Sequence, residues 1–303
     1  MSHLLIELTK TLIGFGELLS NTAIINKIKE NSIYIKDIAL LIKRGIPNSK
    51  IEFDSGFEIN AIKSTFLTNS YLMPIERLQI RYLKEKDCIE KCKEFEKELI
   101  LLPRTILKIR AILSDCTSHI LDRIYYLNID TTNYYNKFIL TILNSTLMTF
   151  YYDYIYGSTK IGGGYIDLKG SQIENFPIPK ISKEEQVPFI ELADKMISLN
   201  EDLSKKANRF LKRLSDSFEA IKINTALEKF YDLEFKDLLA QLKKQKIVLA
   251  LKQQDEWEDY FNDYKTDCTN LLAQINNTDN AINSLVYQLY GLTDEEINLV
   301  EGK

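Results

Sequence analysis

The C-terminal part of the chain, residues 182–303, carries two long series of apolar residues that constrain its fold more than any other feature. In both series the apolar residues recur at spacings of three and four, which is typical of one face of an amphipathic helix. The first series contains Leu192, Met196, Leu199, Leu203, Phe210, Leu214, Phe218 and Ile221, and the second contains Trp257, Phe261, Tyr264, Cys268, Leu271, Ile275, Ile282, Val286 and Leu289. Two such helices must bury their apolar faces, which favours an antiparallel, coiled-coil-like hairpin.

Local signals mark the ends of this helical part. Ser182 and Glu185 form a capping box, in which each side chain accepts a hydrogen bond from the backbone N–H of the other residue at a helix start. Residues 226–246 are helical in pattern but more polar, and they supply the turn between the two long helices. Gly291 suits the left-handed C-cap of the second helix, and a further capping box after it predicts a last short helix.

Residues 1–181 have a different, mixed pattern. β-branched runs and alternating runs indicate strands, and apolar residues near helical spacing indicate helices. The predicted elements are strands over residues 33–42, 102–113 and 125–129 and helices over residues 82–102 and 133–156. We therefore expect an α+β fold, in which a mixed domain over residues 1–181 precedes a long antiparallel helical region over residues 182–303.

Composition and charge narrow the class of protein. The 303 residues are 45% hydrophobic and 27% charged, and no apolar run reaches the roughly 18 residues that cross a bilayer. Four cysteines are too few for a disulfide framework, which favours a reducing, cytoplasmic compartment. Residues 1–180 carry 23 Lys+Arg and 20 Asp+Glu, whereas residues 181–303 carry 16 and 23. The N-terminal part is therefore the one that we expect to face phosphates, if either part does.

The chain lacks residues on which several classes of enzyme depend. The six prolines include no adjacent pair, so the Pro-Pro loop of an amino-methyltransferase is missing. His3 and His119 are the two histidines, which argues against a histidine-dependent triad or a multi-histidine metal site. Gly14 and Gly16 begin a nucleotide-binding motif, but Leu19 stands at the third glycine position, so a structural turn is favoured.

Two further patterns have simple structural interpretations. Cys88 and Cys92 lie four residues apart in a helical stretch with no second pair, which indicates a partly buried helix face in preference to a zinc site. Residues 87–97 contain the acids and the lysine of a nuclease motif, but that motif places its acids at strand ends and these residues predict a helix. We therefore expect no metal, no bound cofactor and no catalysis from this chain.

Cations and a glycine-rich loop mark where DNA would bind. Arg104, Lys108 and Arg110 alternate with apolar residues and would project from one face of a strand, and glycines 162–164 would let a backbone come close to phosphates. Arginine can read guanine and glutamine can read adenine. The candidate DNA-binding residues are Lys43, Arg44, Arg104, Lys108, Arg110, Lys160, Gly163, Lys169, Ser171 and Gln172. Taken singly, each is also typical of a solvated surface, and we interpret the aromatic residues 151–156 as core.

Several segments resemble a known family in their order along the chain. Asn144–Tyr152, a glycine-rich loop and then Phe176–Ile181 are similar to the exit of a target recognition domain, the TaqI-like C-terminal specificity domain of type IIG and type I-like restriction-modification enzymes. Leu285–Ile297 is similar to the C-terminal end of many combined restriction-methylation enzymes. The entry segment differs from the family pattern, because Pro47 and Asn48 stand where the family often has Thr-Gly.

The resemblance implies a sequence-specific DNA recognition module. The mixed domain would read the major groove of double-stranded DNA, and the hairpin would dock a methyltransferase or endonuclease subunit or domain of the same system, which would hold S-adenosylmethionine. The helical region also offers a route to a homodimer. Two alternatives stay open: a helical scaffold or dimerisation protein without DNA binding, and an enzyme of unrecognised type. A basic surface patch would favour the DNA recognition module, an apolar groove the scaffold, and a pocket with clustered carboxylates the enzyme.

Overall fold

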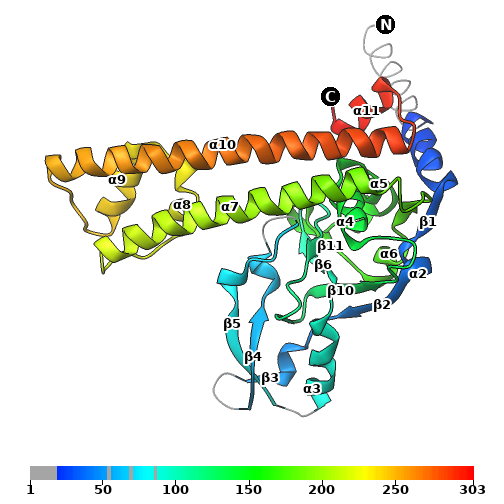
Figure 1. The fold of residues 1–303 in the computed structure, drawn as a ribbon, viewed down its shortest axis with the longest axis horizontal. Coiled ribbons are helices and arrows are strands. Elements are labelled where there is room, and N and C mark those ends of the chain that lie inside the picture. The colour runs from blue at the N-terminus through cyan, green and yellow to red at the C-terminus, as the bar shows by residue number, and fades with distance from the viewer. Residues whose placement is uncertain (1–18, 53–55, 68–70, 85–86) are drawn as a thin grey trace, which may run out of the picture. The chain divides into compact units, whose positions relative to one another are not determined.

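The structure is a computed structural model that describes residues 19–52, 56–67, 71–84 and 87–303 (Figure 1). Gly14, Gly16 and His3 lie outside the described residues. The chain divides into two compact units: residues 1–194 with 281–303, here called the mixed unit, and residues 195–280, here called the helical unit. The boundary predicted after residue 181 lies within the mixed unit, which also takes in the end of the chain.

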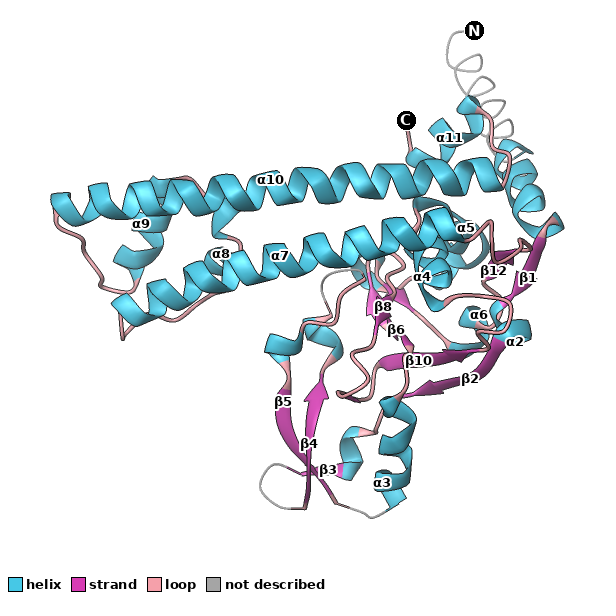
Figure 2. Cartoon of the chain, viewed as in Figure 1, coloured by secondary structure: helices cyan, strands magenta, loops and turns pink. Residues whose placement is uncertain are grey.

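Two four-stranded sheets form the frame of the mixed unit (Figure 2). The first sheet is antiparallel and has the order β2 (Ala39–Arg44), β10 (Ile124–Ile129), β6 (Ile100–Pro103) and β8 (Ile112–Leu113). The second has the order β3 (Ile51–Glu52), β5 (Gln79–Leu83), β4 (Phe57–Ile62) and β9 (His119–Ile120), with β9 parallel to β4. Two short antiparallel pairs join β1 (Ser32–Tyr34) to β12 (Pro177–Pro179) and β7 (Thr105–Ile106) to β11 (Ile166–Asp167).

Helices complete the mixed unit and confirm the predicted α+β class. They include α2 (Ile35–Ile38), α3 (Asp87–Cys92), α4 (Asn136–Asn144), α5 (Thr146–Tyr156), α6 (Gly170–Ile173) and α11 (Asp294–Glu301). Residues 19–30 are also helical, as are residues 187–194 and 281–289, which belong to two long helices. The end of the chain is tied back to its beginning, because Lys27 forms an ion pair of 2.6 Å with Glu296 and the Tyr290 hydroxyl donates a hydrogen bond to the Pro177 carbonyl. The capping box of α11, between Thr293 and Glu296, is present as predicted.

Local hydrogen bonds explain where the elements differ from the sequence prediction. The strand predicted over residues 33–42 is interrupted by α2, because the Asp37 carboxylate accepts the Tyr34 N–H and starts a helical turn. The helix predicted over residues 133–156 is broken at Ser145, whose hydroxyl caps α5 by accepting the Met148 N–H. Only the middle of the helix predicted over residues 82–102 is helical, since its two ends belong to β5 and β6.

The helical unit is built from the two predicted apolar series. It contains residues 195–217 of α7 (Val187–Ser217), residues 251–280 of α10 (Leu251–Leu289), and between them α8 (Thr225–Glu228) and α9 (Phe235–Lys244). The long helices are antiparallel, because Phe218 packs on Trp257 while Lys206 pairs with Asp267. Phe210 and Phe261 are fully buried, and the Phe210 ring stacks on Phe230 with 3.9 Å between ring centroids.

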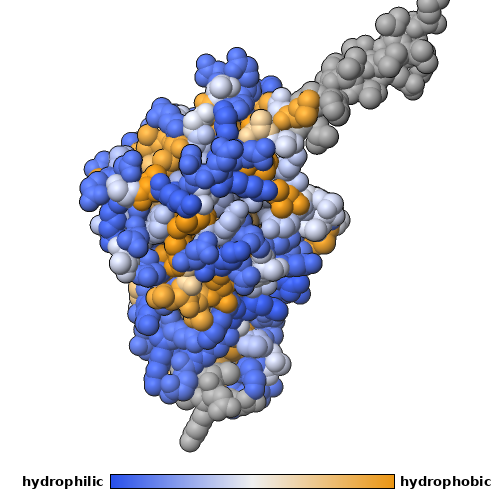
Figure 3. All heavy atoms as spheres, turned by 90° about the vertical axis from the view of Figure 1, so that its right-hand side faces the viewer, coloured by the Kyte–Doolittle hydropathy of each residue, from blue (hydrophilic) through white to orange (hydrophobic). Residues whose placement is uncertain are grey.

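The large apolar side chains of the described chain are mostly buried. Figure 3 shows one face of the molecule, on which hydrophobic residues emerge between hydrophilic ones. The large apolar residues with more than half of their surface exposed include Leu40, Leu107, Val248 and Leu251. Among the described residues, no helix is both long and apolar enough to cross a membrane.

Candidate nucleic-acid interface

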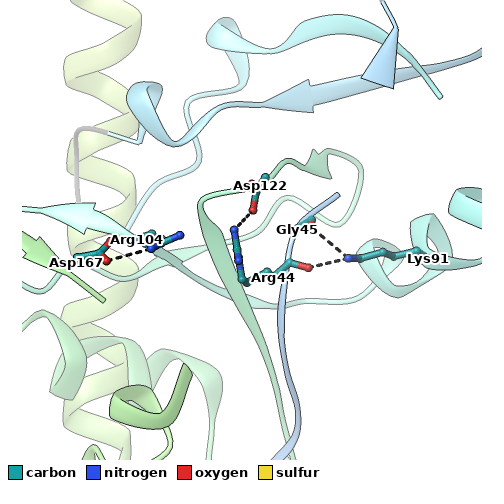
Figure 4. Close-up of polar contacts among 6 residues, drawn as sticks. All are labelled: Arg44, Gly45, Lys91, Arg104, Asp122 and Asp167. Atoms are coloured by element: carbon teal, nitrogen blue, oxygen red, sulfur yellow. Dashed lines mark hydrogen bonds and ion pairs between the residues drawn. The ribbon is translucent and has the colours of Figure 1, made fainter. Parts of the chain in front are cut away.

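The end of strand β2 is held rigidly where Lys43 and Arg44 meet Gly45. A Cβ atom on Gly45 would lie 2.2 Å from the Leu121 carbonyl oxygen, so only glycine lets the two backbones pass this closely. Lys91 donates hydrogen bonds to the Arg44 and Gly45 carbonyls, at 2.7 and 3.1 Å (Figure 4). Gly45 therefore lies in a close-packed turn.

Both cations at the end of β2 are paired with acids. Lys43 forms an ion pair of 2.8 Å with Glu94, and Arg44 forms one with Asp122. Burial raises the pKa of Glu94, but hydrogen bonds from Lys43 and from the Tyr126 hydroxyl outweigh this effect, so the pKa of this carboxyl is lowered overall. Both cations remain about half exposed, so they are fixed in place and still reachable from solvent.

Arg104 is held by a bidentate contact with a carboxylate. It precedes β7, and its Nε and Nη2 donate to the two carboxylate oxygens of Asp167 in β11, at 2.8 and 3.0 Å (Figure 4). These hydrogen bonds raise the pKa of the Arg104 guanidinium and lower the pKa of the Asp167 carboxyl. About a third of the Arg104 side chain is exposed. The bidentate contact uses one edge of the guanidinium and leaves the edge formed by Nη1 and Nη2 for another acceptor.

Further cations surround the Arg104–Asp167 pair. The charges of Lys169 and Arg123 also lower the pKa of Asp167, which places both near this carboxylate. Arg123 lies in a turn, where its carbonyl accepts the Arg104 N–H at 2.8 Å. Lys108, two residues beyond β7, is exposed, as are Arg123 and Lys169. We call Arg44, Arg104, Arg123 and Lys169, together with Lys108 four residues after Arg104 in the sequence, the basic cluster; Asp122 and Asp167 hold two of its members.

The glycine-rich loop begins at the other end of the short β7–β11 pair. Its ends are joined by a hydrogen bond of 2.8 Å from the Ile161 N–H to the Tyr165 carbonyl, and Gly163 has a φ of 76°. A Cβ atom on Gly162 would meet nothing within 4 Å, and its φ is not positive. Neither packing within the described chain nor backbone conformation therefore requires glycine at position 162. Ile161, Tyr165 and the neighbouring Leu107 expose 49%, 41% and 60% of their surfaces.

Four of the residues predicted to bind DNA lie outside the basic cluster. Arg110 is largely buried and donates to the Leu67 carbonyl, and burial lowers the pKa of its guanidinium. Lys160 pairs with Asp153 at 2.8 Å. Gln172 is 5% exposed, and its side-chain oxygen accepts the Lys169 N–H at 2.9 Å, so this amide holds the loop after β11 together. Ser171 is exposed on α6.

The structure adds residues that the sequence analysis passed over. Arg123, Asp122 and Asp167 became candidates only because two strand pairings bring residues 104, 123 and 167 together. The Asp122-Arg123 dipeptide in a turn was the available sequence signal. In the described part of the chain, no group of three or more His, Cys, Asp or Glu side chains could hold a metal ion.

The family of the chain follows from comparison with known proteins. Residues 26–178, just over half of the chain, match the family model described as TaqI-like C-terminal specificity domain. The chain therefore belongs to this family, which confirms the resemblance inferred from the motifs. Residues 182–286, which include the whole helical unit, match a second model, described as a domain of unknown function (DUF8810). No curated protein matches the chain.

Comparison with solved structures finds distant matches. The type IIG restriction endonuclease BpuSI is 11% identical with a TM-score of 0.45, and the match covers 91% of this chain and 33% of BpuSI. The HsdS subunit from Thermoanaerobacter tengcongensis is 10% identical with a TM-score of 0.35, and the match covers 79% of this chain and 54% of that subunit. The chain thus spans about a third of the first protein and about half of the second.

Proposed function

We propose that this chain is the sequence-specific DNA recognition module of a restriction-modification system. Membership of a specificity-domain family supports this function. The observation that carries it is the Arg104–Asp167 pair, a partly exposed arginine held by two hydrogen bonds within a basic cluster. Such a site is suited to read a base in addition to binding phosphate.

The geometry of Arg104 explains how it would read a base. Guanine presents O6 and N7 to the major groove, and an arginine that donates to both distinguishes this base from the other three. A free arginine would lose conformational entropy when it adopts that geometry. Because Asp167 already fixes the guanidinium, much of this loss is avoided, and the Nη1–Nη2 edge is left to meet the base.

The rest of the basic cluster would position the duplex. Lys108, Arg123 and Lys169 are exposed and can neutralise phosphates, which supplies affinity but no sequence information. The register of β7 with β11 places Arg104 opposite Leu168, so at roughly 3.3 Å per residue the glycine-rich loop begins about 13 Å from Arg104. Since the space beside Gly162 is empty, the loop backbone can come close to DNA there, and Leu107, Ile161 and Tyr165 add apolar contacts of the kind that thymine methyl groups accept.

Selection from a randomised duplex library would test this function. The full chain should enrich a defined sequence, with or without a methyltransferase partner added. Arg104→Ala should reduce discrimination at one base position by about 1–3 kcal/mol, whereas Lys108→Ala and Lys169→Ala should weaken binding to all sequences and lower the salt dependence by about one phosphate contact each. If the chain enriches no sequence under either condition, or if Arg104→Ala leaves the enriched sequence unchanged, the proposal is wrong.

The same proposal assigns catalysis to a partner. A methyltransferase or endonuclease subunit or domain would hold S-adenosylmethionine and act at the site that this chain selects. The side of α10 that carries Asp255, Glu256, Asp259 and Asp263, all exposed, supports docking of a basic protein surface. A homodimer through the helical region and a cytoplasmic location stay predictions.

A further inference from the structure

A stripe of cations runs along helix α7 within the helical unit. Its members are Lys205, Lys206, Arg209, Lys212 and Arg213, and all five are exposed. At 100° per residue they span an arc of about 120°, so they form one continuous face beside the buried seam of Leu203, Phe210 and Leu214. We call this face the α7 stripe. Two acids, Asp202 and Asp216, flank it at its ends.

Charge in the helical unit is separated along the chain, although the C-terminal half as a whole is acidic. Residues 195–250 carry 12 Lys+Arg and 8 Asp+Glu, whereas residues 251–280 carry 2 and 7. Residues 195–250 therefore have a net charge of +4 and residues 251–280 one of −5, so the net negative charge of the helical unit lies on α10 and not on the α7 stripe.

Most of the α7 stripe is not neutralised by the protein itself. Lys206 pairs with Asp267 at 2.5 Å and Lys205 with Glu201 at 3.3 Å. Among the described residues, no ion-pair partner is found for Arg209, Lys212 or Arg213. Three exposed cations within five residues create a local positive potential, which attracts a partner of opposite charge.

A groove of about 410 Å³ lies between the stripe and α10. Asp202, Lys205, Lys206 and Arg209 line it on α7, and Asp267, Asn270, Leu271 and Gln274 line it on α10. It therefore holds three cations and two carboxylates, of which Asp267 is paired with Lys206. The side-chain amides of Asn270 and Gln274 are hydrogen-bond donors, and such donors commonly contact phosphate oxygens together with arginine and lysine. The groove therefore extends the phosphate-binding chemistry of the stripe.

We propose that the α7 stripe and its groove bind the phosphate backbone of duplex DNA, outside the sequence that the mixed unit reads. The three cations of the stripe without an ion-pair partner among the described residues lie along about 6 Å of helix. Duplex DNA carries one negative charge per about 1.7 Å of its axis, or 3.4 Å on each strand, so the two charge densities are similar. The inference rests on the proposed function, because it extends the same DNA contact to the segment that matches only a domain of unknown function.

Binding of the full chain to a mixed-sequence duplex of about 40 base pairs, at about 50 mM salt and above, would test the inference. The triple variant Arg209→Ala, Lys212→Ala, Arg213→Ala should bind about tenfold more weakly, with a salt slope reduced by about 2 to 3. The matched control Lys222→Ala, Lys229→Ala, Lys236→Ala removes three exposed lysines elsewhere in the helical unit and should change affinity less than about twofold. Thermal unfolding should be alike for all three proteins.

Two further variants distinguish failure of this inference from failure of the proposed function. One preserves the charge of the α7 stripe, and the other removes cations from the mixed unit. Arg209→Lys with Arg213→Lys should retain binding, because phosphate contact requires charge. If the triple variant binds as tightly as the control, the inference is overturned, while a loss in Lys108→Ala with Lys169→Ala would still support the proposed function. If only the stripe variant loses affinity, the inference stands and the proposed function of the mixed unit fails. A wild-type chain that binds no duplex overturns both.

Discussion

The cations of the mixed unit and those of the helical unit are held in different ways. In the mixed unit, Arg44 and Arg104 are paired with Asp122 and Asp167, and their positions are fixed by the strands that carry them. On α7, Arg209 and Lys212 have no ion-pair partner among the described residues and extend from a helix into solvent. A fixed arginine is suited to read a base edge, whereas a mobile cation is suited to bind phosphate of any sequence.

The two units also differ in what holds them together. The helical unit depends on one continuous apolar seam, with the stacked rings of Phe210 and Phe230 near its centre. The mixed unit depends on pairings between distant segments and on single close contacts such as Gly45 against the Leu121 carbonyl. A single substitution should therefore destabilise each unit for a different physical reason: lost apolar packing in the helical unit and a backbone clash in the mixed unit.

The largest effect should come from the seam of the helical unit. Phe210 is fully buried and contacts the rings of Phe230, Trp257 and Phe261. Phe210→Ala should lower the free energy of unfolding of this unit by about 3–5 kcal/mol, because it removes apolar burial and leaves a cavity. Urea unfolding monitored by Trp257 fluorescence would measure it. A loss below about 1 kcal/mol would show that the seam is not the basis of the hairpin.

Two glycines should respond in opposite directions. Gly45→Ala should destabilise the mixed unit by about 1–3 kcal/mol or more, because the new methyl group meets backbone atoms that cannot move independently. Gly162→Ala should leave stability unchanged or raise it by up to about 1 kcal/mol, since the site is open. Thermal unfolding would compare them. If Gly162→Ala also leaves DNA affinity unchanged, the glycine-rich loop does not approach DNA closely.

Asp167→Asn should separate positioning from charge. The variant removes one negative charge beside Arg104, so binding to DNA of any sequence should become slightly tighter. It also weakens the bidentate contact, so discrimination at the base read by Arg104 should fall by about 1 kcal/mol. Competition between the selected duplex and single-base variants would measure both. Unchanged discrimination would show that Asp167 does not position the arginine.

The smallest effect should appear as a pH dependence at His119. Burial lowers the pKa of this imidazole from its usual 6.5, so below this value the unfolded chain binds more protons than the folded chain. Stability from this group is therefore fully present above about pH 6.5 and declines as the pH falls through it. Urea midpoints at about pH 7.5 and 5.5 should differ less in His119→Gln than in the wild type. An equal decline in both proteins would assign the effect to other groups.

Several features could be predicted from the sequence because they depend on nearby residues. The apolar series of α7 and α10, the capping box at Thr293 and the strand over residues 125–129 all follow from local periodicity or local hydrogen bonds. The motifs at Asn144–Tyr152 and Phe176–Ile181 were sufficient to indicate the family, which the match over residues 26–178 confirms. Arg104 could be chosen as a candidate because it is a cation in an apolar, alternating run.

Contacts between residues that are distant in the sequence could not be predicted and become clear only from the folded structure. Gln172 and Arg110 have the residue types of base readers, yet the fold buries Gln172 and partly buries Arg110, and their polar groups bond within the protein. Arg104 is joined to Asp167, 63 residues later, through the register of β7 with β11. Sequence determines helices and turns through contacts of a few residues, whereas strand register and side-chain burial depend on the whole chain packing at once. The position of each cation relative to its carboxylate therefore becomes visible only in the folded protein.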